Sequence, residues 1–69
     1  MNLFTKRLKE LRKEKKITQV QMAAVLEMTS RNYQRYEAGV LEPSMDNLIK
    51  IADYFSVSLD YLLGRSDER

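Results

Sequence analysis

Residues 18–39 read TQVQMAAVLEMTSRNYQRYEAG and contain two start signals for helices. Thr18 with Gln21 three residues later forms a capping box, which is a start signal for a helix. The apolar residues that follow at helical spacing are Met22, Ala23 and Leu26. Thr29 gives a second start signal, and Gly39 is of the type that commonly ends a helix. The stretch therefore predicts two helices in close succession.

The connection between these two predicted helices consists of Glu27 and Met28. Two short helices joined by so short a turn must cross steeply, which is the geometry of a helix-turn-helix. The second helix, over residues 30–37, carries Tyr33 and Tyr36 on one face. Because this face has the spacing of a core-facing stripe, the opposite face is free to enter a groove.

Three further helices are predicted around this unit. The first covers residues 2–15, with the apolar stripe Phe4, Leu8 and Leu11. The next begins at Ser44, after Pro43, and carries the inward stripe Leu48, Ile51, Ala52 and Phe55. The last runs from the cap Ser58 through Leu63 and is closed by Gly64. We therefore expect a compact all-α domain of five short helices over residues 1–64, and a short flexible tail over residues 65–69, which has no apolar anchor.

The composition excludes several classes of function. A chain of 69 residues makes one small domain, and it contains neither Cys nor His. Disulfides, thiol nucleophiles and imidazole acid–base chemistry are therefore absent, and the usual zinc ligands are missing. We find no catalytic constellation, so we expect no enzyme, no metal and no cofactor. The longest apolar run, residues 22–26, is too short for a bilayer, which predicts a soluble cytoplasmic protein without a membrane partner.

Charge is distributed unevenly along the chain. Residues 1–16 carry seven positive and two negative charges, a net of +5, whereas residues 38–69 carry three positive and six negative, a net of −3. A solvated helix surface and an anionic partner both explain the basic first quarter.

The outward face of the second helix is polar throughout. Its residues are Ser30, Arg31, Gln34 and Arg35, with Asn32 near the edge. Arg can bond guanine and Gln or Asn can bond adenine in the major groove of DNA, although any amphipathic helix also needs a polar outer face. Thr18 and Gln19, at the start of the preceding helix, are placed to cap that helix, to hold a phosphate, or both.

The ordered series of motifs resembles the phage-repressor or Xre-like helix-turn-helix family, from about Leu8 to Gly64. The matching elements are Thr18-Gln19, Met22-Ala23, Leu26, residues 29–39, Pro43-Ser44, Leu48, Ala52 and residues 57–64. The resemblance implies a lambda-repressor-like domain in which the helix over residues 30–37, the third of the five, enters the major groove of double-stranded DNA. It implies base contacts from Ser30, Arg31, Gln34 and Arg35, and phosphate contacts from Thr18, Gln19, Arg12 and Asn32. It also implies an Arg12–Glu37 ion pair, with Tyr33 and Tyr36 mainly in the core.

The chain departs from the family pattern at three places. Glu27 stands in a turn where Gly is common, and the loop Val40-Leu41-Glu42 lacks the usual basic residues. The helix that begins at Thr18 also carries apolar residues at usually polar positions. Those apolar residues are Val20, Ala24 and Val25. A left-handed backbone at Glu27 would cost about 1 kcal/mol or more.

The resemblance further implies a homodimer on an inverted repeat, with contacts at Leu59, Tyr61 and Leu62. The function it implies is a sequence-specific transcriptional regulator, a repressor, associated with the nucleoid and without a small-molecule ligand. The alternative is the same fold used as a protein-interaction module, an antitoxin or anti-repressor partner, which the apolar Val20, Val25, Val40 and Leu41 favour.

Overall fold

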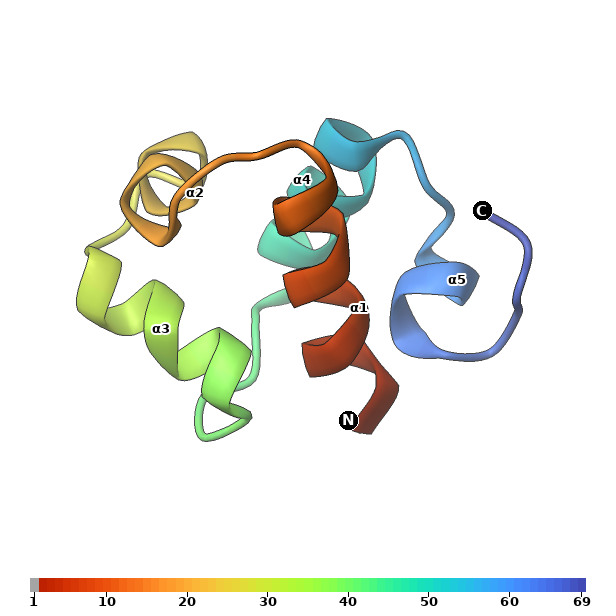
Figure 1. The fold of residues 1–69 in the computed structure, drawn as a ribbon. Coiled ribbons are helices and arrows are strands. Elements are labelled where there is room, and N and C mark those ends of the chain that lie inside the picture. Colours follow the sequence, from red (N-terminus) through yellow and green to blue (C-terminus); the bar gives the residue numbers. More distant parts are fainter. Residues whose placement is uncertain (1) are drawn as a thin grey trace.

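The computed structural model describes residues 2–69 and shows five α-helices packed on one core (Figure 1). The helices are α1 (Asn2–Glu14), α2 (Gln19–Val25), α3 (Ser30–Ala38), α4 (Met45–Phe55) and α5 (Leu59–Leu63). The described residues form no strand, so the predicted all-α class is confirmed. None of the helices in residues 2–69 has both the length and the apolar character needed to cross a bilayer.

Each of the four helices after α1 begins at a hydroxyl cap. The side chains that accept a hydrogen bond from a backbone N–H three residues later are Thr18, Thr29, Ser44 and Ser58. At α2 the Gln21 side chain also accepts from the Thr18 N–H at 2.8 Å, which completes the predicted capping box. These bonds satisfy N–H groups that a helix leaves free at its start.

Left-handed residues end the later helices. The backbone φ angles are 79° at Gly39, 56° at Ser56 and 84° at Gly64. At Gly39 and Gly64 this conformation costs little, because glycine lacks a Cβ atom. α1 ends one residue earlier than predicted, just before Lys16 turns the chain with a φ of 56°. α3 runs one residue longer than predicted, up to its cap at Gly39.

The core places α1 at the centre of the domain. The largest fully buried side chains are Tyr33, Phe4, Leu8, Met22, Ile51 and Leu62. α1 contacts α3 on one side and α5 on the other, while α2 packs against α3 (Figure 1). The outward face of α3 is therefore carried by a helix whose opposite face is fixed in the core.

The turn between α2 and α3 contains one unfavourable backbone conformation. Glu27 has a φ of 55°, so the left-handed conformation considered for this position is present. The N–H groups of Glu27 and Met28 donate to the Ala24 and Ala23 carbonyls at 3.1 and 3.0 Å, which holds the turn closed. A non-glycine residue in this region costs about 1–2 kcal/mol.

Residues 65–69, for which the sequence shows no apolar anchor, make polar contacts with the rest of the domain. The tail folds back along α5 towards α1 (Figure 1). Its contacts are Ser58 N–H to the Arg69 carbonyl (2.6 Å), Arg69 to Glu14 (2.5 Å), Arg7 to the Ser66 carbonyl (2.6 Å) and Arg7 to Asp67 (2.9 Å). The prediction considered only apolar anchors, whereas charged and backbone groups hold the segment.

Candidate nucleic-acid interface

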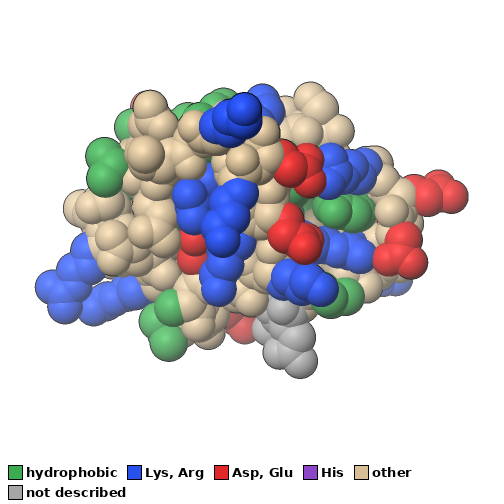
Figure 2. All heavy atoms as spheres, in the orientation of Figure 1, with side chains coloured by type: hydrophobic (Ala, Val, Ile, Leu, Met, Phe, Trp, Pro, Cys, Tyr) green, Lys and Arg blue, Asp and Glu red, His purple; other side chains and the backbone are tan. Residues whose placement is uncertain are grey.

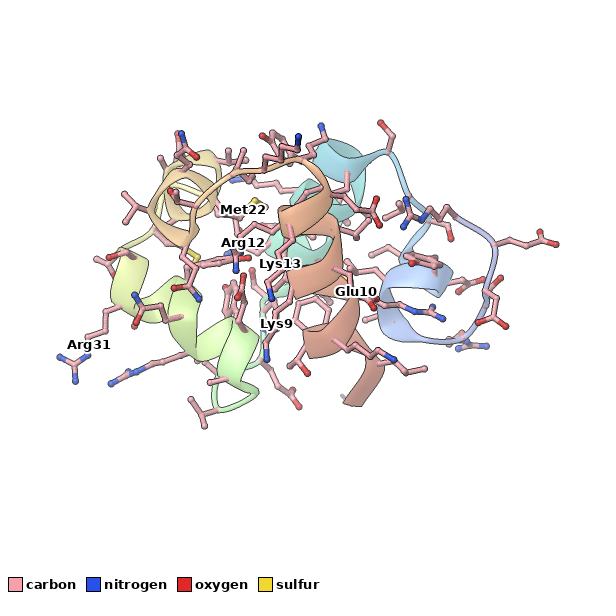
Figure 3. All side chains as sticks on the ribbon, viewed as in Figure 1. Lys9, Glu10, Arg12, Lys13, Met22 and Arg31 are labelled. Atoms are coloured by element: carbon pink, nitrogen blue, oxygen red, sulfur yellow. The ribbon has the colours of Figure 1, made fainter. Side chains whose placement is uncertain are left out.

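The outward face of α3 is open to solvent. Arg31, Gln34 and Arg35 are exposed, and Ser30 and Asn32 are half-buried. Arg31 extends from α3 away from the body of the domain (Figure 3). No carboxylate among residues 2–69 forms an ion pair with Arg31 or Arg35. Their guanidinium groups therefore retain their full capacity to bond a partner.

The inward face of α3 is aromatic and buried, as predicted. The rings of Tyr33 and Tyr36 meet edge to face, with centroids 6.3 Å apart. The Tyr36 hydroxyl accepts a hydrogen bond of 2.8 Å from the Asn47 amide, which joins α3 to α4. This packing fixes the rotation of α3 about its own axis and so fixes which side chains face outward.

A carboxylate at the end of α3 gathers donors from three helices. Glu37 accepts from Arg12 at 2.6 and 3.2 Å, so the ion pair implied by the resemblance is present. The Tyr33 hydroxyl donates to Glu37 at 2.5 Å, and the Gln19 amide donates at 3.1 Å. The guanidinium of Arg12 also donates to the Ile17 carbonyl at 3.0 Å. We call Arg12, Gln19, Tyr33 and Glu37 the Glu37 cluster.

The Glu37 cluster keeps its carboxylate ionised although the side chain is only 3% exposed. Burial acts to raise the pKa of Glu37, but the hydrogen bonds from Arg12, Tyr33 and Gln19 outweigh burial and lower it. Burial and the bond to Glu37 raise the pKa of the Tyr33 hydroxyl, so that group stays a donor. The hydrogen bonds and the ion pair of the Glu37 cluster therefore connect α1, α2 and α3.

The residues predicted to contact phosphates differ in how free they are. Thr18 is exposed, but its hydroxyl caps α2. Gln19 gives one amide N–H to Glu37 and has a second available. Arg12 is only 13% exposed and is largely occupied by Glu37, whereas Asn32 is half-buried on α3.

Several apolar side chains lie at the surface, as the departures from the family pattern predict. Val20 on α2 is 65% exposed and Val40, in the loop after α3, is 74% exposed. Leu41 and Val25 are also exposed. The loop between α3 and α4 thus offers apolar side chains and no positive charge.

The three residues predicted for a dimer contact differ in how accessible they are. Leu62 has no exposed surface, so the prediction for Leu62 is wrong: it fills the core and cannot touch a second copy. Leu59 is half-buried and keeps some surface. The Tyr61 ring lies under the guanidinium groups of Arg7 and Arg69, 4.1 and 5.3 Å from its centroid, so α1 and the tail together cover it.

Sequence reasoning did not find two partners of Glu37 or the anchoring role of Arg7. The Tyr33–Glu37 bond has a local signal, since residues four apart share a helix face. The Gln19–Glu37 and Arg7–Asp67 contacts span 18 and 60 positions and have no such signal.

Comparison with known proteins finds helix-turn-helix proteins. A family model described as helix-turn-helix matches residues 8–62. The chain is 47% identical over 68 residues to the uncharacterized HTH-type transcriptional regulator YqaE of Bacillus subtilis, covering 97% of the chain and 59% of the relative. It is 44% identical over 59 residues to the cryptic phage CTXphi transcriptional repressor RstR of Vibrio cholerae, covering 86% and 53%. The chain thus spans a little over half the length of these relatives.

Proposed function

The chain belongs to the helix-turn-helix family, and we propose on this basis that it is a sequence-specific double-stranded-DNA-binding regulator of transcription, acting as a repressor. One observation carries the proposal: α3 holds exposed Arg31, Gln34 and Arg35 side chains on a helix whose inward face is locked in the core. The relatives' names, regulator and repressor, support it. The activity is binding rather than catalysis, and its place is on the nucleoid in the cytoplasm.

In the proposed complex α3 lies in the major groove. Arg31 and Arg35 bond guanine O6 and N7, Gln34 bonds adenine N6 and N7, and Ser30 contacts a neighbouring base edge. Every one of these side chains ends in hydrogen-bond donors, which suits base edges and phosphates alike.

Phosphate contacts position the domain but carry no sequence information. We assign them to the free N–H of the Gln19 amide, to Asn32 at the edge of α3, to the exposed Thr18 and to the remaining donors of Arg12. Because Gln19 and Arg12 are both bonded to Glu37, a phosphate held there is fixed relative to α3.

We propose that two copies bind an inverted repeat, with half-sites about one DNA turn, roughly 34 Å, apart. Leu59 and Tyr61 on α5 are the proposed contact. Tyr61 becomes available to a second copy only if both Arg7 and Arg69 move from its ring.

The test is in vitro selection of the protein on random duplexes, followed by binding of Arg31→Ala to the enriched site. We expect an enriched inverted repeat, a loss of about 1–3 kcal/mol in binding for Arg31→Ala, and relaxed preference at one base pair. Arg65→Ala removes the same charge from the exposed segment that follows α5 and should leave base preference unchanged.

A selection that enriches no sequence would overturn the proposal. The exposed Val20 and Val40 would then favour the second candidate, a protein-interaction module, and recovery of one stoichiometric protein partner would establish it.

A further inference from the structure

The basic side chains of α1 fall into two groups. Arg7 and Arg12 are engaged, with Asp67 and Glu37 respectively. Lys15, directly after α1, bonds the Tyr54 carbonyl. Lys6, Lys9 and Lys13 are exposed, and no residue within 2–69 forms an ion pair with them. The fold therefore uses part of the positive charge of α1 and leaves the rest free.

The free lysines share one face of α1. Their spacing of three and then four residues places them in a stripe. The core residues Phe4, Leu8 and Leu11 occupy the opposite face. The stripe is therefore the outermost surface of α1, and its charges are not needed for packing.

The stripe lies beside α3. Figure 3 shows Lys9 and Lys13 projecting on the side of α1 that carries Arg12, next to α3, while Glu10 projects towards α5. Figure 2 shows Lys and Arg side chains gathered in a blue band on this face of the domain. Because Arg12 is bonded to Glu37 of α3, the stripe and the α3 face form one rigid unit.

We propose that Lys9 and Lys13 bind backbone phosphates of the same DNA duplex that α3 reads, a proposal that rests on the proposed function. Duplex DNA carries one negative charge per about 1.7 Å of its axis. A row of lysines beside α3 therefore lies close to backbone phosphates when α3 is in the major groove. The loop after α3 carries no Lys or Arg, so this row supplies positive charge that the loop does not.

The chemistry of the stripe favours DNA over an acidic protein. Protein interfaces have apolar cores and are depleted in lysine. Between Lys6 and Lys13, α1 exposes no large apolar side chain. Phosphate binding needs only positive charges, and the lysine stripe of α1 provides them.

The experiment measures how the affinity for the enriched duplex depends on salt in Lys9→Gln, Lys13→Gln and Lys50→Gln. Lys50 is exposed on α4, so the third variant loses the same charge from a different helix. Each phosphate contact contributes about 0.9 to the slope of log affinity against log salt. Lys9→Gln and Lys13→Gln should each lose about that amount, so that a fourfold rise in salt weakens each about 3.5-fold less than wild type. Lys50→Gln should keep the wild-type slope.

Lys9→Arg and Lys13→Arg should also keep the wild-type slope, because the charge is retained. Equal slopes for Lys9→Gln, Lys13→Gln and Lys50→Gln would overturn the lysine assignment while leaving the DNA-binding function intact. A wild-type protein that binds no duplex would overturn the proposed function itself and this inference with it. Thermal unfolding of each variant checks that the fold is retained.

Discussion

Replacing Glu37 by glutamine preserves the shape of the side chain and removes the charge on which four donor contacts converge. Two come from Arg12, at 2.6 and 3.2 Å, and the others from Tyr33 and Gln19. A carboxylate accepts at both oxygens, whereas an amide has one oxygen and one NH2 group. In Glu37→Gln at least one donor therefore faces another donor, and the Arg12 charge loses its partner.

The cost follows from the burial of the pair. Removing one partner of a buried ion pair costs about 3–5 kcal/mol. Since Arg12 keeps 13% of its side chain in contact with water, we expect the lower end, about 3 kcal/mol. A domain of this size has a total stability of about 3–10 kcal/mol, so the substitution removes a large share of it.

Urea unfolding followed by far-ultraviolet circular dichroism measures this loss. With a denaturant dependence of about 1 kcal/mol per molar urea, the midpoint should fall by about 3 M. Glu10→Gln is the control, because Glu10 is exposed and unpaired in the described chain, and it should stay within about 0.5 kcal/mol of wild type. If Glu37→Gln also stays within that margin, the Glu37 cluster does not stabilise the domain and the reasoning is refuted.

Three further predictions concern stability. The pKa of Glu37 is lower in the folded protein than in the unfolded chain, so the unfolded chain is protonated at Glu37 first as the pH falls; the stabilisation that the Glu37 carboxylate provides is therefore complete above about pH 5 and is lost as the pH drops through the native pKa. Urea midpoints should fall more steeply below about pH 4.3 in wild type than in Glu37→Gln. Parallel curves of urea midpoint against pH would contradict this prediction. Glu27→Gly should raise the free energy of unfolding by about 1 kcal/mol, because its φ of 55° suits glycine, and an unchanged urea midpoint would show that the turn is not strained. Gly64→Ala should destabilise more than Gly39→Ala in the same assay: both have φ near 80°, but a Cβ at Gly64 meets Leu3 at 2.7 Å, while one at Gly39 lies 3.5 Å from its nearest neighbour. Equal losses would show that Leu3 moves aside freely.

The helix starts could be predicted because their causes are local. Thr29, Ser44 and Ser58 each bond a backbone N–H three residues later, so the signal and its effect lie within one turn. The end of α4 at Ser56 could not be predicted in this way, since a serine in the left-handed conformation has no mark in the sequence.

The sequence predicts which residues lie on the outward face of α3, but it does not predict the contacts between residues far apart in the chain. The outward position of Arg31 and Gln34 follows from the spacing of the buried Tyr33 and Tyr36. The Arg12–Glu37 pair joins residues 25 apart, and only the family resemblance indicated it. The resemblance implied that Tyr61 contacts a second copy, but Arg7 and Arg69 cover its ring, and periodicity does not encode these long-range contacts.

The hydroxyl caps described above also bear on how quickly the chain folds. Four helices both begin and end on interactions within about a turn of their own sequence. Chains dominated by such short-range contacts typically reach the native state in microseconds to milliseconds. A domain of modest stability that refolds on this timescale unfolds often, but each unfolded molecule refolds within microseconds to milliseconds. Each opening then gives a protease or an aggregating neighbour very little time to act.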